Sequence, residues 1–185
     1  MRTHLCQFNM SSDQAAKLRN LVAQKTTSIS TRQCPLTVCS GSKGGVGTTT
    51  LSFNLAIAMQ RRGQRVLLVE ANATSGDLSQ LCRLSEEYDL IDVLQSRCSI
   101  RQALLPGPCG VKLLPQRALP ETISDASYWH LLRILDEIRC EFDEVIVDSG
   151  NSGTATETLW SAATRAVVVT TPEQLAVTKA YTLVK

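Results

Sequence analysis

Short apolar runs alternate with stretches of helical periodicity from Pro35 onward. The runs contain no polar alternation, which is typical of parallel strands buried on both faces. We therefore predict strands at 36–39, 65–69, 111–114, 144–147 and 166–169, and crossover helices at 52–62, 90–105 and 129–140. Strand and helix in repeated alternation predict a three-layer α/β fold with a mainly parallel sheet.

The sequence over 1–34 follows a different pattern. A Ser-Ser-Asp segment ending at Asp13 offers a helix N-cap, and apolar residues then recur at three- and four-residue spacing. This pattern predicts a short amphipathic helix over 12–24. The hydroxyl-rich stretch 26–33 has no period and is typical of a linker. We predict an N-terminal helix with its linker at 1–34, and a globular domain at 35–185.

Composition and charge narrow the class of protein. The chain has 185 residues, 43% of them hydrophobic, which is enough for one domain with a substantial core. The net charge of +2, without a dense Lys/Arg tract, gives no electrostatic footprint for nucleic acid. With neither a secretory leader nor the roughly 18-residue apolar run of a membrane span, the chain is expected to be cytoplasmic. Its seven cysteines are scattered without a C-x-x-C pair, so we expect reduced thiols and no zinc site.

A glycine-rich loop directly follows the first predicted strand and precedes a helical pattern. Glycines let successive backbone N–H groups turn toward one point, and a helix N-terminus adds its positive end, so the order of elements suits a phosphate-binding loop. A glycine-rich turn without a ligand is the alternative. The residues that we expect around the phosphates are Gly41, Lys43, Gly44, Gly45, Val46, Gly47, Thr48, Thr49 and Thr50.

The K-G-G-x-G pattern at 43–47 resembles the deviant Walker A loop of the MinD/ParA-type P-loop ATPases. The resemblance implies a P-loop NTPase-like fold, ATP or ADP with Mg²⁺ as cofactors, and an ATP-dependent homodimer in which Lys43 crosses to the partner's nucleotide. It also implies that the Thr49 hydroxyl is a magnesium ligand. The general pattern G-x-x-x-x-G-K-[ST] has a lysine where this sequence has Thr48. A hydroxyl cannot replace an ammonium that neutralises phosphates, so we expect weak ATP affinity and turnover.

Two further positions of the family's site follow predicted strands. Where the family usually carries D-x-D, this sequence has Glu70-Ala71-Asn72. The resemblance implies that Glu70 lies near magnesium, although Glu70 could also merely end a strand. Asn72 can orient a water but cannot accept its proton. Asp148 matches the Walker B aspartate in the magnesium's second shell. The expected catalytic positions are therefore Lys43, Asn72 and Asp148, in a degenerate site.

Two weaker matches come later in the chain. The segment Gly150–Gly153 resembles the family's small loop that senses the γ-phosphate. The segment Thr171–Gln174 resembles the T-P-E-P segment that lies near the adenine, which nominates Pro172 as a nucleotide contact. Each signal is weak alone, and their order along the chain reinforces the resemblance.

Within the family, the chain looks most like FlhG, a flagellar regulator. The stretch 90–115 resembles the FlhG/MinD region, and 13–19 reads D-Q-A-A-K-L-R, matching the D-Q-A-x-x-L-R element of FlhG proteins. In that family this helix binds the GTPase FlhF and stimulates GTP hydrolysis, and basal-body components are further partners. The resemblance therefore nominates four partner-binding residues, Asp13, Gln14, Leu18 and Arg19. The alternative is a solvated amphipathic helix that matches by coincidence.

Two functions remain open. One is an FlhG-like regulator of flagellar number or placement, whose degenerate site binds nucleotide with weak or lost hydrolysis. The other is an active MinD/ParA-like ATPase switch that dimerises on ATP for spatial positioning. Thr48 and Asn72 favour the first function, whereas Lys43, Thr49 and Asp148 keep the second open.

The resemblance covers nearly the whole chain, yet the family's domain ordinarily continues with further strands and an amphipathic membrane helix. We therefore expect that the chain ending at Lys185 is a fragment or a shortened protein, without a membrane-anchoring segment.

Iron–sulfur reductases with the same loop need a bridging cysteine after the fourth strand. No cysteine follows Asp148, so that class is excluded.

Overall fold

The structure, a computed structural model, describes residues 34–72, 77–83, 85, 87–116, 125–151 and 153–185. All of them belong to one compact unit, Gln33–Lys185. The predicted helix over 12–24, with its D-Q-A-A-K-L-R element, lies outside the described residues. The predicted division between 34 and 35 stays a prediction.

The described residues contain six strands in one sheet. In spatial order they are β3 (Leu105–Pro106), β4 (Lys112–Leu114), β2 (Val66–Glu70), β5 (Glu144–Asp148), β1 (Leu36–Gly41) and β6 (Arg165–Val169). Every pairing is parallel except that of β3 with β4. The predicted mainly parallel sheet is confirmed, and each predicted strand coincides with an observed one.

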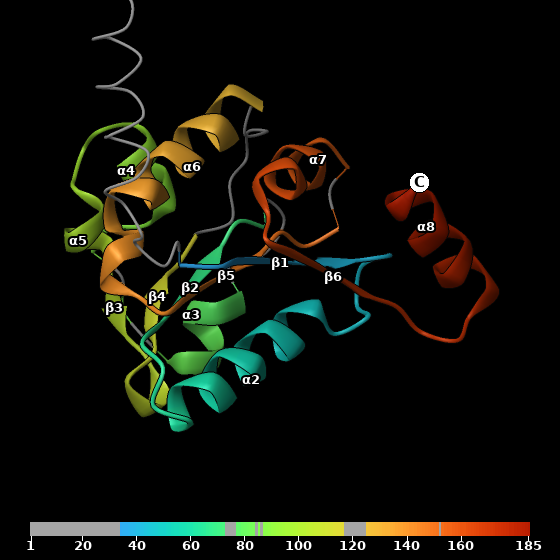
Figure 1. The fold of residues 1–185 in the computed structure, drawn as a ribbon, viewed down its shortest axis with the longest axis horizontal. Helices are drawn as coiled ribbons and strands as arrows, with labels where there is room; N and C mark the ends of the chain where they lie inside the picture. Colours follow the sequence, from blue (N-terminus) through green and yellow to red (C-terminus); the bar gives the residue numbers. More distant parts are fainter. Residues whose placement is uncertain (1–33, 73–76, 84, 86, 117–124, 152) are drawn as a thin grey trace, which may run out of the picture. The chain divides into compact units, whose positions relative to one another are not determined.

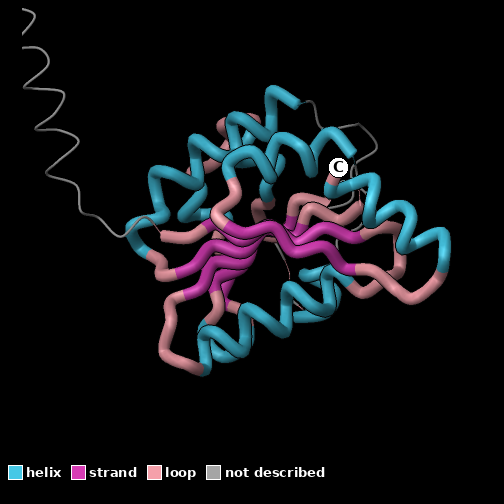
Figure 2. Tube along the Cα trace, turned by 45° about the vertical axis from the view of Figure 1, so that its right-hand side comes forward, coloured by secondary structure: helices cyan, strands magenta, loops and turns pink. Residues whose placement is uncertain are grey.

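Helices cover both faces of the sheet (Figure 1), and Figure 2 shows the strands between the two helical layers. One face carries α2 (Thr48–Arg61) and α3 (Asp77–Cys82). The other carries α4 (Leu90–Leu94), α5 (Ile100–Ala103), α6 (Asp125–Ile138) and α7 (Gly153–Ala162). Short 3-10 turns span Pro108–Gly110 and Arg139–Glu141, and α8 (Gln174–Val184) follows β6. This arrangement confirms the predicted three-layer α/β fold.

Each face of the sheet buries its own apolar cluster. Val38 and Val145 pack with α4 to α7, whereas their strand neighbours Cys39 and Ile146 pack with α2 and α3. Successive strand residues point to opposite faces, so strands covered on both sides need apolar residues without alternation. Full burial of a Val or Ile side chain contributes about 1.5–3 kcal/mol. The apolar runs in the sequence follow directly from this double coverage.

The single helix predicted over 90–105 is wrong, because the chain turns within it. Ser96 has a φ of 58°, in the left-handed region that ends a helix. Asp89 accepts hydrogen bonds from two backbone N–H groups at the start of α4, and Ser99 begins a second capping box at α5. Leu105 already belongs to β3. These local caps outweigh the continuous apolar period.

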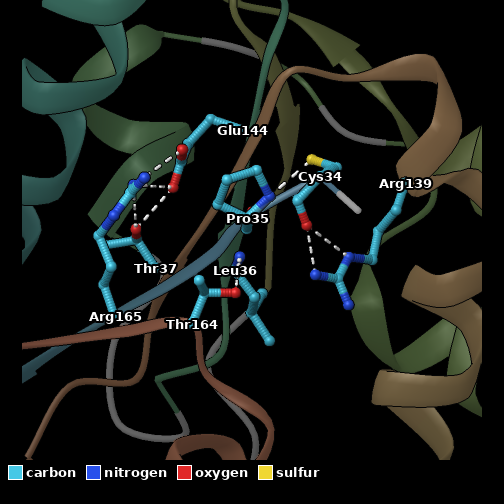
Figure 3. A network of polar contacts seen from close by, with 8 residues as sticks. All are labelled: Cys34, Pro35, Leu36, Thr37, Arg139, Glu144, Thr164 and Arg165. Atoms are coloured by element: carbon cyan, nitrogen blue, oxygen red, sulfur yellow. Dashed lines mark hydrogen bonds and ion pairs between the residues drawn. The ribbon is translucent and has the colours of Figure 1, made fainter. Parts of the chain in front are cut away.

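A polar network joins the amino ends of β1, β5 and β6 (Figure 3). The buried Glu144 carboxylate accepts hydrogen bonds from Thr37 Oγ1 at 2.6 Å and from Arg165 Nη1 at 3.0 Å. We call these three residues the amino-edge clamp. Beside it, the Arg139 guanidinium donates to the backbone carbonyl of Cys34. A buried carboxylate is tolerated only with such partners, so the clamp fixes this edge of the sheet.

The described helices differ in their burial. Helix α8 buries Ala176 but exposes four large apolar side chains, Leu175, Val177, Tyr181 and Val184. Within the described part of the chain, no helix has the length and apolar character needed to cross a membrane.

Candidate functional site

Three neighbouring strands end at the edge of the sheet opposite the amino-edge clamp. Strand β1 ends at Gly41, β2 at Glu70 and β5 at Asp148. The register pairs Glu70 with Asp148, and Asp148 with Cys39. Ligands of open parallel sheets bind outside the carboxyl ends of the strands. The structure therefore brings the predicted site residues of all three strands to one edge.

The glycine-rich loop connects β1 directly to α2. Gly45 and Gly47 have φ values of 78° and 91°, which residues with a Cβ rarely adopt. Helix α2 begins at Thr48, earlier than the predicted start at 52, and no side chain caps its first turn. The N-cap Gly47 has no side chain, so no N-cap side chain accepts from the N–H groups of that turn at the positive end of the helix. A phosphate group fits this arrangement.

The loop opens into a pocket of about 450 Å³, within the roughly 300–1,000 Å³ of small-molecule sites. Its lining residues are Lys43, Gly44, Gly45, Gly47, Thr48, Thr49, Thr50, Asn72, Gly150 and Asn151. Gly41, Val46, Glu70, Asp148 and Pro172 are outside this lining set. Gly41 supports the loop instead, because a Cβ there would lie 2.5 Å from Thr48 Oγ1. Direct contact of these residues with a nucleotide stays a prediction.

Lys43 supplies the positive charge among the lining residues, and an acidic residue of the same chain pairs with it. The Lys43 ammonium forms an ion pair with the carboxylate of Glu173, which directly follows Pro172. The side chains are 27% and 61% exposed, so the pair contributes at most about 1 kcal/mol. Nearby, Ser42 Oγ donates to Thr170 Oγ1 at 3.1 Å. The glycine-rich loop is thus linked directly to the segment after β6. The sequence placed both segments near the nucleotide but did not indicate these two contacts.

Asn72 closes one side of the pocket by lying over Gly150. A Cβ on Gly150 would come within 2.4 Å of the Asn72 side chain, and Gly150 has a φ of 64°. The backbone carbonyl of Asn72 accepts a hydrogen bond from Gln116 Nε2 at 3.1 Å. The predicted water-orienting residue and the predicted γ-phosphate loop are therefore in close contact.

The Glu70 carboxylate holds two backbone segments at the edge of the sheet. Its Oε1 accepts from the Leu78 N–H and its Oε2 from the Gln116 N–H, each at 3.2 Å. These bonds join the ends of β2 and β4 to the start of α3. Glu70 thus has a structural role in addition to the magnesium contact, which stays a prediction. Gln116 was missed by sequence reasoning, although a polar residue two positions after the end of a strand is the signal that could have identified it.

The donor groups suit phosphates better than they suit a protein-held cation. The described residues include no group of three or more His, Cys, Asp or Glu side chains that could hold a metal ion. Mg²⁺ in nucleotide sites takes one or two protein ligands and otherwise binds phosphates and water. Thr49, in the lining, Glu70 and the buried Asp148, whose Oδ1 accepts from the Gly150 N–H at 3.2 Å, stay the predicted residues that would hold it from this chain.

Cys39 lies beside Asp148 and is shielded from solvent. Burial, together with the negative charges of Asp148 and Glu144, raises the pKa of its thiol to about 12. Because the thiolate is the reactive form, Cys39 should stay unmodified by iodoacetamide at pH 8, whereas the exposed Cys109 and Cys140 should react. Mass spectrometry of the native protein, with a denatured control in which all thiols react, measures this. Equal labelling of Cys39 and Cys109 in the native protein would contradict the expected burial.

Comparison with known proteins gives one matching family. The AAA domain family, AAA_31, matches residues 36–185. The chain is 32% identical to antiactivator FleN of Pseudomonas aeruginosa over 149 residues, 78% of this chain and 53% of FleN. It is 34% identical to the septum site-determining protein MinD of Bacillus subtilis over 145 residues, 76% of this chain and 54% of MinD.

A third relative and a solved structure extend the comparison. The flagellum site-determining protein YlxH of Helicobacter pylori is 26% identical over 147 residues, 77% of this chain and 50% of YlxH. MinD of Pyrococcus horikoshii, solved with Mg-ADP, superposes with a TM-score of 0.67 at 25% identity, covering 78% of this chain and 60% of that one. The chain spans about half the length of the curated relatives that it matches.

Proposed function

This chain belongs to the AAA_31 family of MinD/ParA-type P-loop ATPases, and we propose that it is an FlhG-like, nucleotide-binding regulator of flagellar number or placement. In this proposal the pocket binds ATP or ADP, and hydrolysis is weak or lost. The predicted N-terminal helix stimulates an FlhF-type GTPase. The likeness to a flagellum site-determining protein and the D-Q-A-A-K-L-R element support the flagellar assignment.

The observation that carries the nucleotide part is the uncapped start of α2 behind a left-handed glycine loop. This arrangement offers backbone donors and a positive helix end to phosphates whatever the side chains are. Two side chains of the same pocket differ from the residues that the family uses for ATP hydrolysis. Thr48 offers a hydroxyl in place of an ammonium, and Asn72 has no basic group. Binding without efficient turnover is the function that this combination supports best.

An active ATPase switch that dimerises on ATP is the second candidate. The observation that favours it is Lys43, which lines the pocket and keeps 27% of its side chain exposed. In this reading Lys43 leaves Glu173 and reaches the nucleotide of a second copy. Single-turnover hydrolysis of Mg-ATP, measured beside binding by calorimetry, separates the two candidates. Binding with little product supports the regulator, robust turnover supports the switch, and no binding refutes both.

The partner assignment is tested with the whole chain. The wild-type protein should accelerate GTP hydrolysis by an FlhF-type GTPase, because a glutamine amide can both donate to and accept from an attacking water. We expect Gln14→Ala to reduce the stimulated rate at least about ten-fold, which corresponds to about 1.4 kcal/mol of transition-state stabilisation. Gln24→Ala, the same change further along the predicted helix, should leave it unchanged. Absence of stimulation by the wild type would remove the flagellar assignment.

A further inference from the structure

A buried chain of hydrogen bonds leads from α7 to the base of the glycine-rich loop. Trp160 Nε1 donates to Ser40 Oγ at 2.9 Å, and Ser40 Oγ lies 2.6 Å from Ser149 Oγ. The Ser149 hydroxyl lies 3.1 Å from the Cys39 carbonyl, to which it donates. The two serines are fully buried, and Trp160 is partly buried against the apolar cluster. Each hydroxyl has one proton, and that of Ser149 goes to the Cys39 carbonyl, so Ser40 is the donor within the serine pair while it accepts from the indole.

The two serines stand where β1 and β5 give way to the two loops of the pocket. Ser40 directly precedes Gly41, and Ser149 directly precedes Gly150. The backbones are joined at the same place, because the Gly41 N–H donates to the Gly150 carbonyl at 2.7 Å. A shift of either loop therefore also displaces the serine pair.

Trp160 attaches this pair to a helix that reaches the surface. Helix α7 begins at Gly153, the last residue of the predicted γ-phosphate loop, and exposes Glu157 and Ser161. A buried hydroxyl that loses a partner costs more than the hydrogen bond itself contributed. The serine pair and the indole therefore stabilise one another as a unit. A displacement of the pair either moves Trp160 or breaks the hydrogen bond from Trp160 to Ser40.

We propose that Trp160 is a positioning residue that couples occupancy of the phosphate pocket to α7. Nucleotide phosphates order the loops at Gly41 and Gly150, and the serine pair passes this change through the indole to α7. The surface of α7 then differs between the empty and the nucleotide-bound protein, as a partner-binding surface requires. The coupling rests on the nucleotide binding of the proposed function, and it assigns Trp160 a role beyond it.

Hydrogen-exchange mass spectrometry with and without saturating Mg-ADP tests the coupling. Bound Mg-ADP should slow amide exchange in α7 of the wild type by about five-fold or more. Trp160→Phe keeps the aromatic packing but removes the donor, so its α7 response should fall below about two-fold while its Kd for Mg-ADP stays within about three-fold. Trp129→Phe is the matched control, because Trp129 is 54% exposed on α6. It should respond as the wild type does.

Ser40→Ala removes the acceptor of the same bond and should also abolish the α7 response, which keeps the test decisive if Trp160→Phe folds poorly. A full response in a variant that lacks either group would overturn the coupling. A wild type that binds Mg-ADP without any change in α7 would overturn the coupling and leave the proposed function intact. A wild type that does not bind Mg-ADP would remove both, and calorimetry distinguishes this case from the previous one.

Discussion

Replacing Thr48 with lysine is expected to tighten Mg-ATP binding by about ten- to a hundred-fold, because a hydrogen bond to a charged group contributes about 1.5–3 kcal/mol. Thr48 is buried at the first position of α2 and lines the pocket. An ammonium there adds charge beside the uncapped helix start, where developing negative charge on the phosphates needs it. Isothermal calorimetry with Mg-ATP and Mg-ADP measures the affinity, and single-turnover assays show whether hydrolysis returns.

Thr50→Lys is the matched control for Thr48→Lys. It adds the same charge to the same pocket two residues later, but from an exposed position. If the position of the ammonium matters, Thr50→Lys should change affinity by less than about three-fold, the size expected of a screened surface charge. Equal gains in both variants would show that general electrostatic attraction governs binding. No gain in Thr48→Lys would contradict the assignment of the pocket to phosphates.

Gly150→Ala is expected to destabilise the fold by about 2–5 kcal/mol, the sum of the strain of a left-handed residue and the cost of overpacking. At this position φ is 64° and the new Cβ would lie 2.4 Å from the Asn72 side chain. The substitution must therefore shift the end of β2, the loop after β5, or both. Urea denaturation monitored by circular dichroism gives the change in the free energy of unfolding. Calorimetry should show weakened nucleotide binding, since both displaced segments line the pocket.

Two further variants separate the causes of this destabilisation. Gly63 has a φ of 86° and no atom within 4 Å of an added Cβ, so Gly63→Ala carries the backbone strain alone, about 1–2 kcal/mol. In the double variant Asn72→Ala/Gly150→Ala, the colliding side-chain atoms are gone, and part of the lost stability should return. Strictly additive effects at Asn72 and Gly150 would argue that the two residues do not touch.

The sheet and the glycine-rich loop could be predicted because their signals are local. A strand covered on both faces requires a continuous apolar run, and Gly45 and Gly47 carry the left-handed conformations that the loop needs. Register then brought Glu70 and Asp148 together without further information, since parallel strands end at one edge. The break at Ser96 escaped prediction because periodicity alone favoured one helix, whereas the Asp89 and Ser99 caps decided the local structure.

The contacts between distant segments could not be predicted from residue patterns. The pairing of Lys43 with Glu173 joins residues 130 positions apart, and the bond from Trp160 to Ser40 joins residues 120 positions apart. Both depend on the neighbouring positions of β1, β6 and α7 in three dimensions, which no local period encodes. The role of Glu70 escaped for the same reason, because its partners are backbone N–H groups that carry no sequence signature.

The amino-edge clamp has a consequence for how this protein can diverge. Glu144, Thr37 and Arg165 secure three strands at the edge farthest from the glycine-rich loop. Substitutions such as a threonine at 48 or an asparagine at 72 alter the chemistry of the opposite edge and touch no member of the clamp. Changes at these two positions can therefore remove catalytic groups while the hydrogen bonds of the clamp stay intact. A protein of this architecture can therefore lose its catalytic activity and still keep its fold.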